Sequence, residues 1–166
     1  MEQFAFWLET TPLSRIIQEV TWIIPWLQII HITALALVFG AILMLMARLL
    51  RLVGTGEAVS ATLRRLLPWV WAGTAVLALS GGLLVIGEPV RSLLNEFFWA
   101  KMVVLVIALA GTLHLYRRDA AAPGYWEGGG VSAAYVRSLA VASLAGWTLI
   151  IVFGRFIAYR DNFLYF

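Results

Sequence analysis

Four basic residues stand inside otherwise apolar stretches of this chain: His31, Lys101, His114 and Arg155. Ionisable side chains are costly in an apolar environment, and those that persist there commonly serve a ligand, an ion or a cofactor. A neutral histidine offers a ring nitrogen to a metal ion, whereas lysine and arginine supply positive charge for a carboxylate or a phosphate. These residue types therefore indicate either of two functions. One is ligation of a metal or porphyrin, with His31 as the candidate metal ligand, and the other is binding of an anion.

Three of the four residues are expected at the same depth. In each apolar stretch an arginine marks the opposite end, at a distance of 17 residues from His31, 16 from Lys101 and 18 from Arg155. At a helical rise of 1.5 Å per residue, these separations correspond to about 24–27 Å. The three basic groups would thus form one layer near one face of a membrane. The marking arginines are Arg48, Arg117 and Arg137.

His114 is expected at a different depth, because it lies only 3 residues before Arg117. Its imidazole would then lie roughly 20 Å from the level of His31, whereas two axial ligands of one haem iron should be nearly level. Lys101 and His114 also fall on different faces of their helix, since 13 residues turn it by about 220°. Either two porphyrin sites exist, or His31 ligates alone or with a partner such as Lys101.

Structural roles are open for each of these side chains. A hydrogen bond to a neighbouring carbonyl or hydroxyl would satisfy His31. Lys101 and Arg155 could extend to the lipid headgroups, with their apolar stems along the membrane. His114, one turn from Arg117, would then be an interface histidine.

The elements that position these residues are four long apolar stretches, each able to cross a hydrocarbon core of about 30 Å. They predict an all-α protein, an integral membrane antiparallel four-helix bundle, with Pro68 in the first turn of the second span and Ser80, Gly81, Gly146 and Gly154 allowing close helix approach. A short interfacial helix is expected where Thr11 caps and Pro12 begins a helix. The predicted single domain is 1–166, with the short helix at about 12–20 and spans at about 22–46, 66–87, 97–116 and 138–159.

Composition agrees with membrane placement. Hydrophobic residues make up 62% of the chain and charged residues 13%, which is far from the balance of soluble domains. The lack of cysteine excludes disulfides, iron–sulfur clusters, cysteine-bound zinc and covalent c-type haem. The twelve Lys and Arg residues form no continuous stripe, so no nucleic-acid partner is expected. The expected partner is the lipid bilayer.

The distribution of arginine predicts the orientation. Seven arginines fall in the connections between spans 1 and 2 and between spans 3 and 4, against three on the other side. Positive charge favours the cytoplasm, so both termini are expected outside, in the periplasm. Glu2 and the lack of a basic N-terminal region predict that no signal peptide is cleaved. The three arginines of the outer side are Arg15, Arg91 and Arg160.

Several segments together carry a family resemblance: 11–14, 31–40, 67–73, 80–81, 100–103 and 154–159, with His114. Over its full length the chain resembles a family of small bacterial four-helix membrane proteins of unassigned activity. More remotely, the histidine of the first span, the Ser80-Gly81 pair and the lysine that opens the third span resemble HemJ-type protoporphyrinogen oxidases and the membrane domain of CopD-type copper proteins. The resemblance implies a bacterial cytoplasmic (inner) membrane location.

In the HemJ type, the histidine of the first span and the lysine of the third are essential and a b-type haem is bound. The resemblance thus implies haem b, with His31 as an axial ligand and Lys101 as second ligand or propionate partner. Arg155 is expected to neutralise a propionate, and His114 is kept as a residue of a second site. The interfacial helix and the Gly154-Arg155 pair depart from the HemJ pattern, so protoporphyrinogen oxidation does not transfer directly.

The sequence therefore predicts a haem- or porphyrin-binding membrane protein in electron transfer or porphyrin redox chemistry, with a membrane or periplasmic redox partner. Two alternatives are anion or copper transport through the layer of His31, Lys101 and Arg155, and an accessory role in a larger membrane complex. A homo-oligomer is compatible with each of these three functions.

Overall fold

The computed structural model describes residues 1–54, 56–127 and 131–159, and Arg160 lies outside them. Within these ranges all regular structure is helical and no strand occurs. The elements in chain order are α1 (Glu2–Glu9), α2 (Pro12–Glu19), α3 (Ile23–Leu49), α4 (Val59–Gly87), α5 (Pro89–Leu93), α6 (Glu96–Ala121) and α7 (Ala133–Ile157).

Four of these helices, α3, α4, α6 and α7, are long and apolar enough to cross a membrane. They contain 27, 29, 26 and 25 residues, which corresponds to about 38–44 Å of helix each. The all-α prediction and the four long apolar helices are thus confirmed. The helices begin and end within a few residues of the predicted spans, except at the start of α4, the end of α6 and the start of α7.

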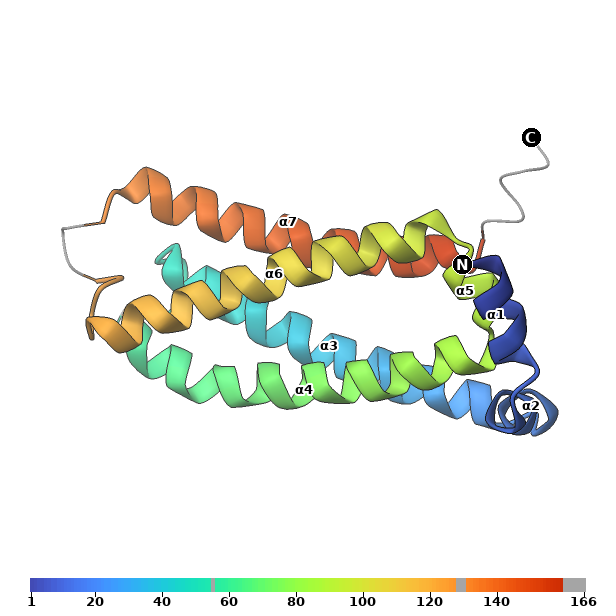
Figure 1. Cartoon of the computed structure of the whole chain (residues 1–166). Helices are drawn as coiled ribbons and strands as arrows, with labels where there is room; N and C mark the ends of the chain where they lie inside the picture. The colour runs from blue at the N-terminus through green and yellow to red at the C-terminus, as the bar shows by residue number, and fades with distance from the viewer. Residues whose placement is uncertain (55, 128–130, 160–166) are drawn as a thin grey trace.

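The long helices form two antiparallel pairs. The most extensive contacts join α3 to α4 and α6 to α7, and α3 also packs on α7. By contrast, α4 and α6 make at most marginal contact. Figure 1 shows all four helices running lengthwise side by side.

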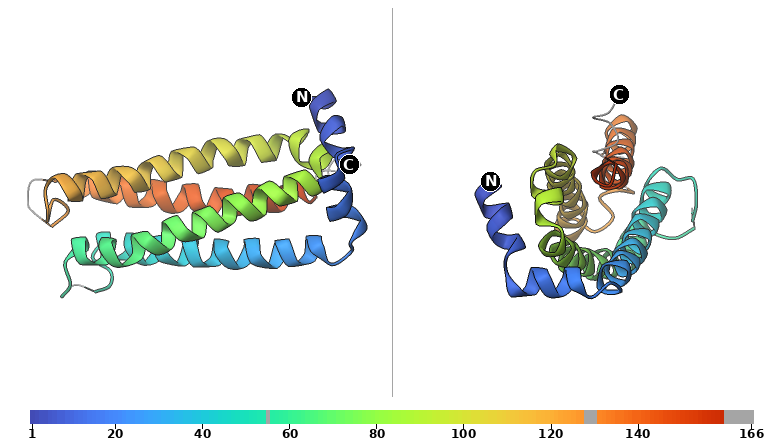
Figure 2. Two further views of the ribbon diagram at one scale, coloured as in Figure 1. Left: turned by 60° about the horizontal axis from the view of Figure 1, so that its bottom comes forward. Right: turned by 90° about the vertical axis from the view of Figure 1, so that its right-hand side faces the viewer.

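Three short helices lie across one end of the long ones, as Figures 1 and 2 show. Of these, α2 confirms the predicted helix: Pro12 stands in its first turn and the Thr11 hydroxyl accepts a hydrogen bond from the Ser14 N–H. The other two, α1 and α5, were not predicted from the sequence. Ile17 of α2 packs so closely on Gly87 of α4 that a Cβ there would lie 2.6 Å from Ile17 Cγ2. We call this end the capped end and the opposite one the loop end.

The prediction for Pro68 was wrong. The structure places Pro68 inside α4, which already begins at Val59. Helix is favoured this early because Val59 and Leu63 are buried in the core. A carboxylate oxygen of Glu127 also accepts a hydrogen bond from the Val59 N–H and so satisfies one donor at the start of α4. These contacts outweigh the loss of one backbone hydrogen bond at the proline.

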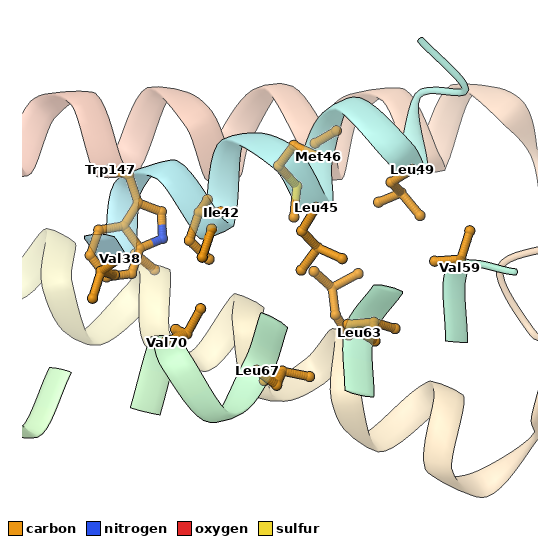
Figure 3. Packing of buried hydrophobic residues seen from close by; sticks show 14 of the residues in the cluster. Val38, Ile42, Leu45, Met46, Leu49, Val59, Leu63, Leu67, Val70 and Trp147 are labelled. Atoms are coloured by element: carbon orange, nitrogen blue, oxygen red, sulfur yellow. The ribbon is translucent and has the colours of Figure 1, made fainter. Parts of the chain in front are cut away.

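The buried core occupies only half the length of the long helices. Its members lie between residues 38 and 49 of α3, 59 and 70 of α4, 108 and 115 of α6, and 140 and 150 of α7, with Trp126 beside them. Figure 3 shows Trp147 of α7 against Val38 and Ile42 of α3 within this cluster. We call this half, next to the loop end, the packed half.

The half next to the capped end, which we call the open half, is different. Among the described residues of the long helices, those buried there are Ala34 of α3 and Gly73, Ser80 and Gly87 of α4. Before Ala108 no residue of α6 is buried, and none of α7 is buried after Ile150. The α3–α4 pair and the α6–α7 pair therefore pack on each other in one half and bury little of each other in the other half.

Candidate functional site in the open half

The imidazole of His31 lies in the open half and is fixed by Ser80 of the neighbouring helix α4. The Nδ1 and Ser80 Oγ atoms are 2.9 Å apart, and Ser80 Oγ is also 2.7 Å from the carbonyl oxygen of Val76. A hydroxyl has one proton, and donation to the Val76 carbonyl leaves the Ser80 oxygen to accept from His31 Nδ1–H. This hydrogen-bond network makes Nε2 the nitrogen with a free lone pair.

Gly81 makes room for the His31 ring against α4. A Cβ atom at Gly81 would lie 3.1 Å from His31 Cε1, closer than side chains normally approach, and 3.6 Å from Nδ1. The Ser80-Gly81 pair thus supplies both the hydrogen-bond acceptor and the space for the ring. His31 is held in this way while remaining half-buried.

Lys101 reaches the same region from the other helix pair. It lies on α6 with its side chain along α7, where a Cβ atom at Gly154 would be 3.7 Å from Lys101 Nζ. Lys101 is half-buried, and in the part of the chain that the structure describes its ammonium makes no hydrogen bond or ion pair. Lys101 is 5 residues into α6 and His31 is 8 residues into α3, and both helices start at the capped end. The structure therefore places His31 and Lys101 at a similar level in the open half, one on each helix pair.

Arg155 points elsewhere. Its Nη2 donates a hydrogen bond of 2.5 Å to the Tyr159 hydroxyl, and its guanidinium lies over the Tyr159 ring, 4.5 Å from the centroid. The side chain is exposed, and none of the described contacts joins it to His31 or Lys101. Among the described contacts, Arg155 is thus engaged by Tyr159 and is not brought to the other two basic groups.

His114 lies far from His31, in the part of α6 near the loop end. It is 18 residues into α6, whereas His31 is 8 residues into α3, and both helices start at the capped end (Figure 1). The imidazoles are therefore about 15 Å apart along the helix axes. The Nε2 atom of His114 is hydrogen-bonded to the Tyr135 hydroxyl at 2.9 Å, and the ring meets Trp126 edge-on. His114 thus connects α6, α7 and the segment between them.

Sequence reasoning missed the partners of the two site residues. It interpreted Ser80, Gly81 and Gly154 as helix-packing positions, whereas the structure also places them against His31 and Lys101. The only signal was the presence of a hydroxyl and of glycines in apolar spans. Pairing them with a given side chain requires the register between two helices, which spacing within one helix does not encode.

Comparison of the chain with profiles of known protein families, with curated proteins and with solved structures finds no match. Within the described ranges, no three His, Asp or Glu side chains gather in the manner of a protein-bound metal ion.

Proposed function

We propose that the four long helices form a transmembrane bundle that binds a b-type haem, or a related porphyrin, between its two helix pairs in the open half. The observation that carries the proposal is the hydrogen bond between His31 Nδ1 and Ser80 Oγ, because it orients the imidazole and leaves Nε2 free to ligate. A single protein nitrogen suffices here, since a porphyrin supplies the four in-plane nitrogens itself.

The residues present fit such a group. His31 would hold the iron, and Ser80 would keep its ring in the ligating tautomer. Lys101 would face the group from α6, as a second nitrogen ligand or as the counter-charge of a propionate. Bound haem supplies one-electron redox chemistry.

The scarcity of buried residues on α6 and α7 in the open half supports the location. A flat apolar ring there would cover surfaces that the two helix pairs leave uncovered by each other. The ammonium of Lys101, without a described partner, would gain an anionic group in a region of low polarity, where an isolated charge is unfavourable.

In this proposal the capped end faces the periplasm of a bacterial inner membrane and the loop end faces the cytoplasm. The arginines between α3 and α4 and between α6 and α7 support this orientation. The activity would be electron transfer to a membrane or periplasmic partner, or redox chemistry on a porphyrin.

A second candidate is binding or transport of an anion. It is favoured by Lys101, a half-buried cation without a described partner, in the same half of the molecule as the imidazole of His31. An anion that stabilises the colourless protein against heating, with loss of the effect in Lys101→Ala, would support this candidate.

The absorption spectrum of the protein purified in detergent from haem-replete cells tests the first candidate. We expect a Soret band, sharp α and β bands after reduction with dithionite, and one haem per chain in a pyridine haemochrome assay. A colourless protein would contradict the haem proposal.

Two histidine variants form a matched pair for the same measurement. His31→Ala is expected to lose the Soret band, whereas His114→Ala should keep it, because its imidazole is bonded to Tyr135 near the loop end. Ser80→Ala should retain haem but weaken its binding by about 10–100-fold, as expected for loss of the hydrogen bond that orients a ligand. Haem retained in His31→Ala and lost in His114→Ala would reverse the assignment.

A further inference from the structure

A pocket with two arginines in its lining lies at the loop end, between α3 and α4. Arg48, in the last turn of α3, is only 7% exposed. Its guanidinium donates to the backbone carbonyl of Glu57, while its Nε–H is buried without a partner in the part of the chain that the structure describes. No carboxylate among the described residues forms an ion pair with it. The charge of a buried guanidinium that is bonded to a backbone carbonyl, and not to a carboxylate, is not compensated by an ion pair. Such a charge favours the approach of an anion.

The two carboxylates nearest to this site are already engaged. Glu57 accepts hydrogen bonds from both terminal nitrogens of Arg65, at 3.2 and 3.1 Å. Glu127 accepts from the Val59 N–H at the start of α4. Both residues line the same pocket as Arg48, Glu57 in an ion pair with Arg65 and Glu127 with one oxygen bonded to a backbone N–H.

Arg51 is a second arginine that borders the pocket, and its backbone conformation is unfavourable. Its φ angle of 59° is left-handed, a region in which glycine or asparagine normally ends a helix. The Leu52 N–H donates to the Ala47 carbonyl at 2.9 Å and the Arg51 N–H donates to the Arg48 carbonyl at 3.0 Å, which completes the helix end. An arginine at this position costs more conformational free energy than glycine would. We take this cost as a sign that the arginine side chain serves a purpose other than ending the helix.

The pocket itself has a volume of about 540 Å³ and is bordered by Arg48, Arg51, Trp126 and the segment that enters α4. It lies at the end of four helices that are long enough to cross a membrane, which is the level of lipid headgroups. Guanidinium groups bind phosphate oxygens through paired N–H donors, and phosphate is the anion that a bilayer presents at this level.

We infer that Arg48 and Arg51 form a binding site for a phosphate group, supplied by the headgroup of an anionic phospholipid. The inference rests on the membrane placement proposed above but not on haem, so either can fail without the other. Inorganic phosphate offers the same chemistry, and the experiment must separate the two sources.

The test uses the full-length protein in a neutral detergent at physiological ionic strength, with thermal unfolding followed by tryptophan fluorescence. The additions are phosphatidylglycerol, phosphatidylcholine or sodium phosphate. At about a hundredfold excess over Kd, phosphatidylglycerol should raise the melting temperature by roughly 5–10 °C, and phosphatidylcholine should not. A rise with sodium phosphate alone would identify the same site as one for a free anion.

Three variants decide whether the pocket is responsible. Arg48→Gln should abolish the rise, and Arg64→Gln should retain it, because Arg64 is an exposed arginine of α4 outside the pocket. Arg51→Gly is the sharpest variant: its melting temperature without lipid should equal or exceed that of the unmodified protein, since glycine fits the left-handed position, yet its response to phosphatidylglycerol should be reduced.

Two results would overturn the inference. One is an equal effect of phosphatidylglycerol and phosphatidylcholine, with no effect of sodium phosphate. The other is a response to phosphatidylglycerol that is the same in Arg51→Gly as in Arg64→Gln, which would indicate attraction to the general positive charge. If Arg48→Gln does not fold, the comparison of Arg51→Gly with Arg64→Gln still decides between the outcomes.

Discussion

The packed half and the open half of the long helices differ in which surfaces they bury. In the packed half, all four helices contribute to one core that includes Ile42 and Trp147. In the open half, the buried residues of the long helices are small ones of α3 and α4, among them Ala34 and Gly73. The same helices thus continue from a region where the two pairs pack on each other to one where each pair packs mainly on itself.

This difference separates the residues that stabilise the fold from the residues of the candidate site. The packed half fixes the relative position of the two helix pairs. His31 and Lys101, one on each pair, are then held in the open half without having to pack on each other. Three predictions test this separation.

The largest effect is expected for truncation of an isoleucine on α3. Ile42→Ala removes a side chain with 0% exposure in the packed half and should lower the free energy of unfolding by about 2–5 kcal/mol. Ile32→Ala, ten residues earlier on the same helix, removes one that is 63% exposed and should cost less than about 1 kcal/mol.

Both isoleucine variants are measured by unfolding in mixed micelles of increasing sodium dodecyl sulfate content, followed by tryptophan fluorescence. Equal losses of stability would mean that the open half is closely packed in solution, and the comparison between the halves would fail.

A smaller effect is expected for two glycines of α4. A Cβ atom at Gly73, where the halves meet, would lie 2.5 Å from Val38 Cγ2, so Gly73→Ala should destabilise by about 1–3 kcal/mol. Gly82, in the open half, has no atom within 4 Å of such a Cβ, so Gly82→Ala should be neutral or stabilise by up to about 1 kcal/mol. The same unfolding assay applies.

Val38→Ala combined with Gly73→Ala is the control for the first of these variants. If the clash is the cause, the pair of substitutions should cost less than the sum of the two single ones. A Gly82→Ala variant as unstable as Gly73→Ala would show that another group occupies the space beside Gly82.

The sequence predicted what is encoded along one helix. Four long apolar stretches fixed the number of long helices, and Thr11-Pro12 fixed the start of α2. The start of α4 was wrong because Glu127, sixty-eight residues away, satisfies its first N–H, and Pro68 gave a stronger local signal. Contacts between distant segments decide such boundaries.

For the candidate site, the sequence indicated the level of each residue along its helix but not its neighbours. Helical rise placed His31 and Lys101 at one level, and both lie in the open half, on different helix pairs. The same arithmetic placed Arg155 at that level, but depth alone does not say to which side of a helix a long side chain turns, and Arg155 turns to Tyr159. Ser80 as the partner of His31 follows from the register of α3 on α4, which is set by contacts such as that of Gly73 with Val38.

The smallest effect concerns two buried tryptophans at the packed half. Trp147 is 0% exposed and its Nε1–H has no partner among the described residues, whereas Trp126 is 5% exposed and its Nε1–H donates to the Leu115 carbonyl at 3.2 Å. Phenylalanine removes the N–H in both cases and leaves a similar gap. Trp126→Phe also leaves a buried carbonyl without that donor, so it should cost about 1 kcal/mol more than Trp147→Phe.

This pair of tryptophan variants tests whether the packed half is dry. A buried N–H stays unpaired only if no water reaches it, and because an unpaired N–H is costly, its removal then offsets part of the lost packing. If Trp147→Phe costs as much as Trp126→Phe, the Trp147 N–H has a partner in solution, such as a water molecule that enters from the open half. The boundary between the halves would then lie closer to the loop end than the burial of Trp147 indicates.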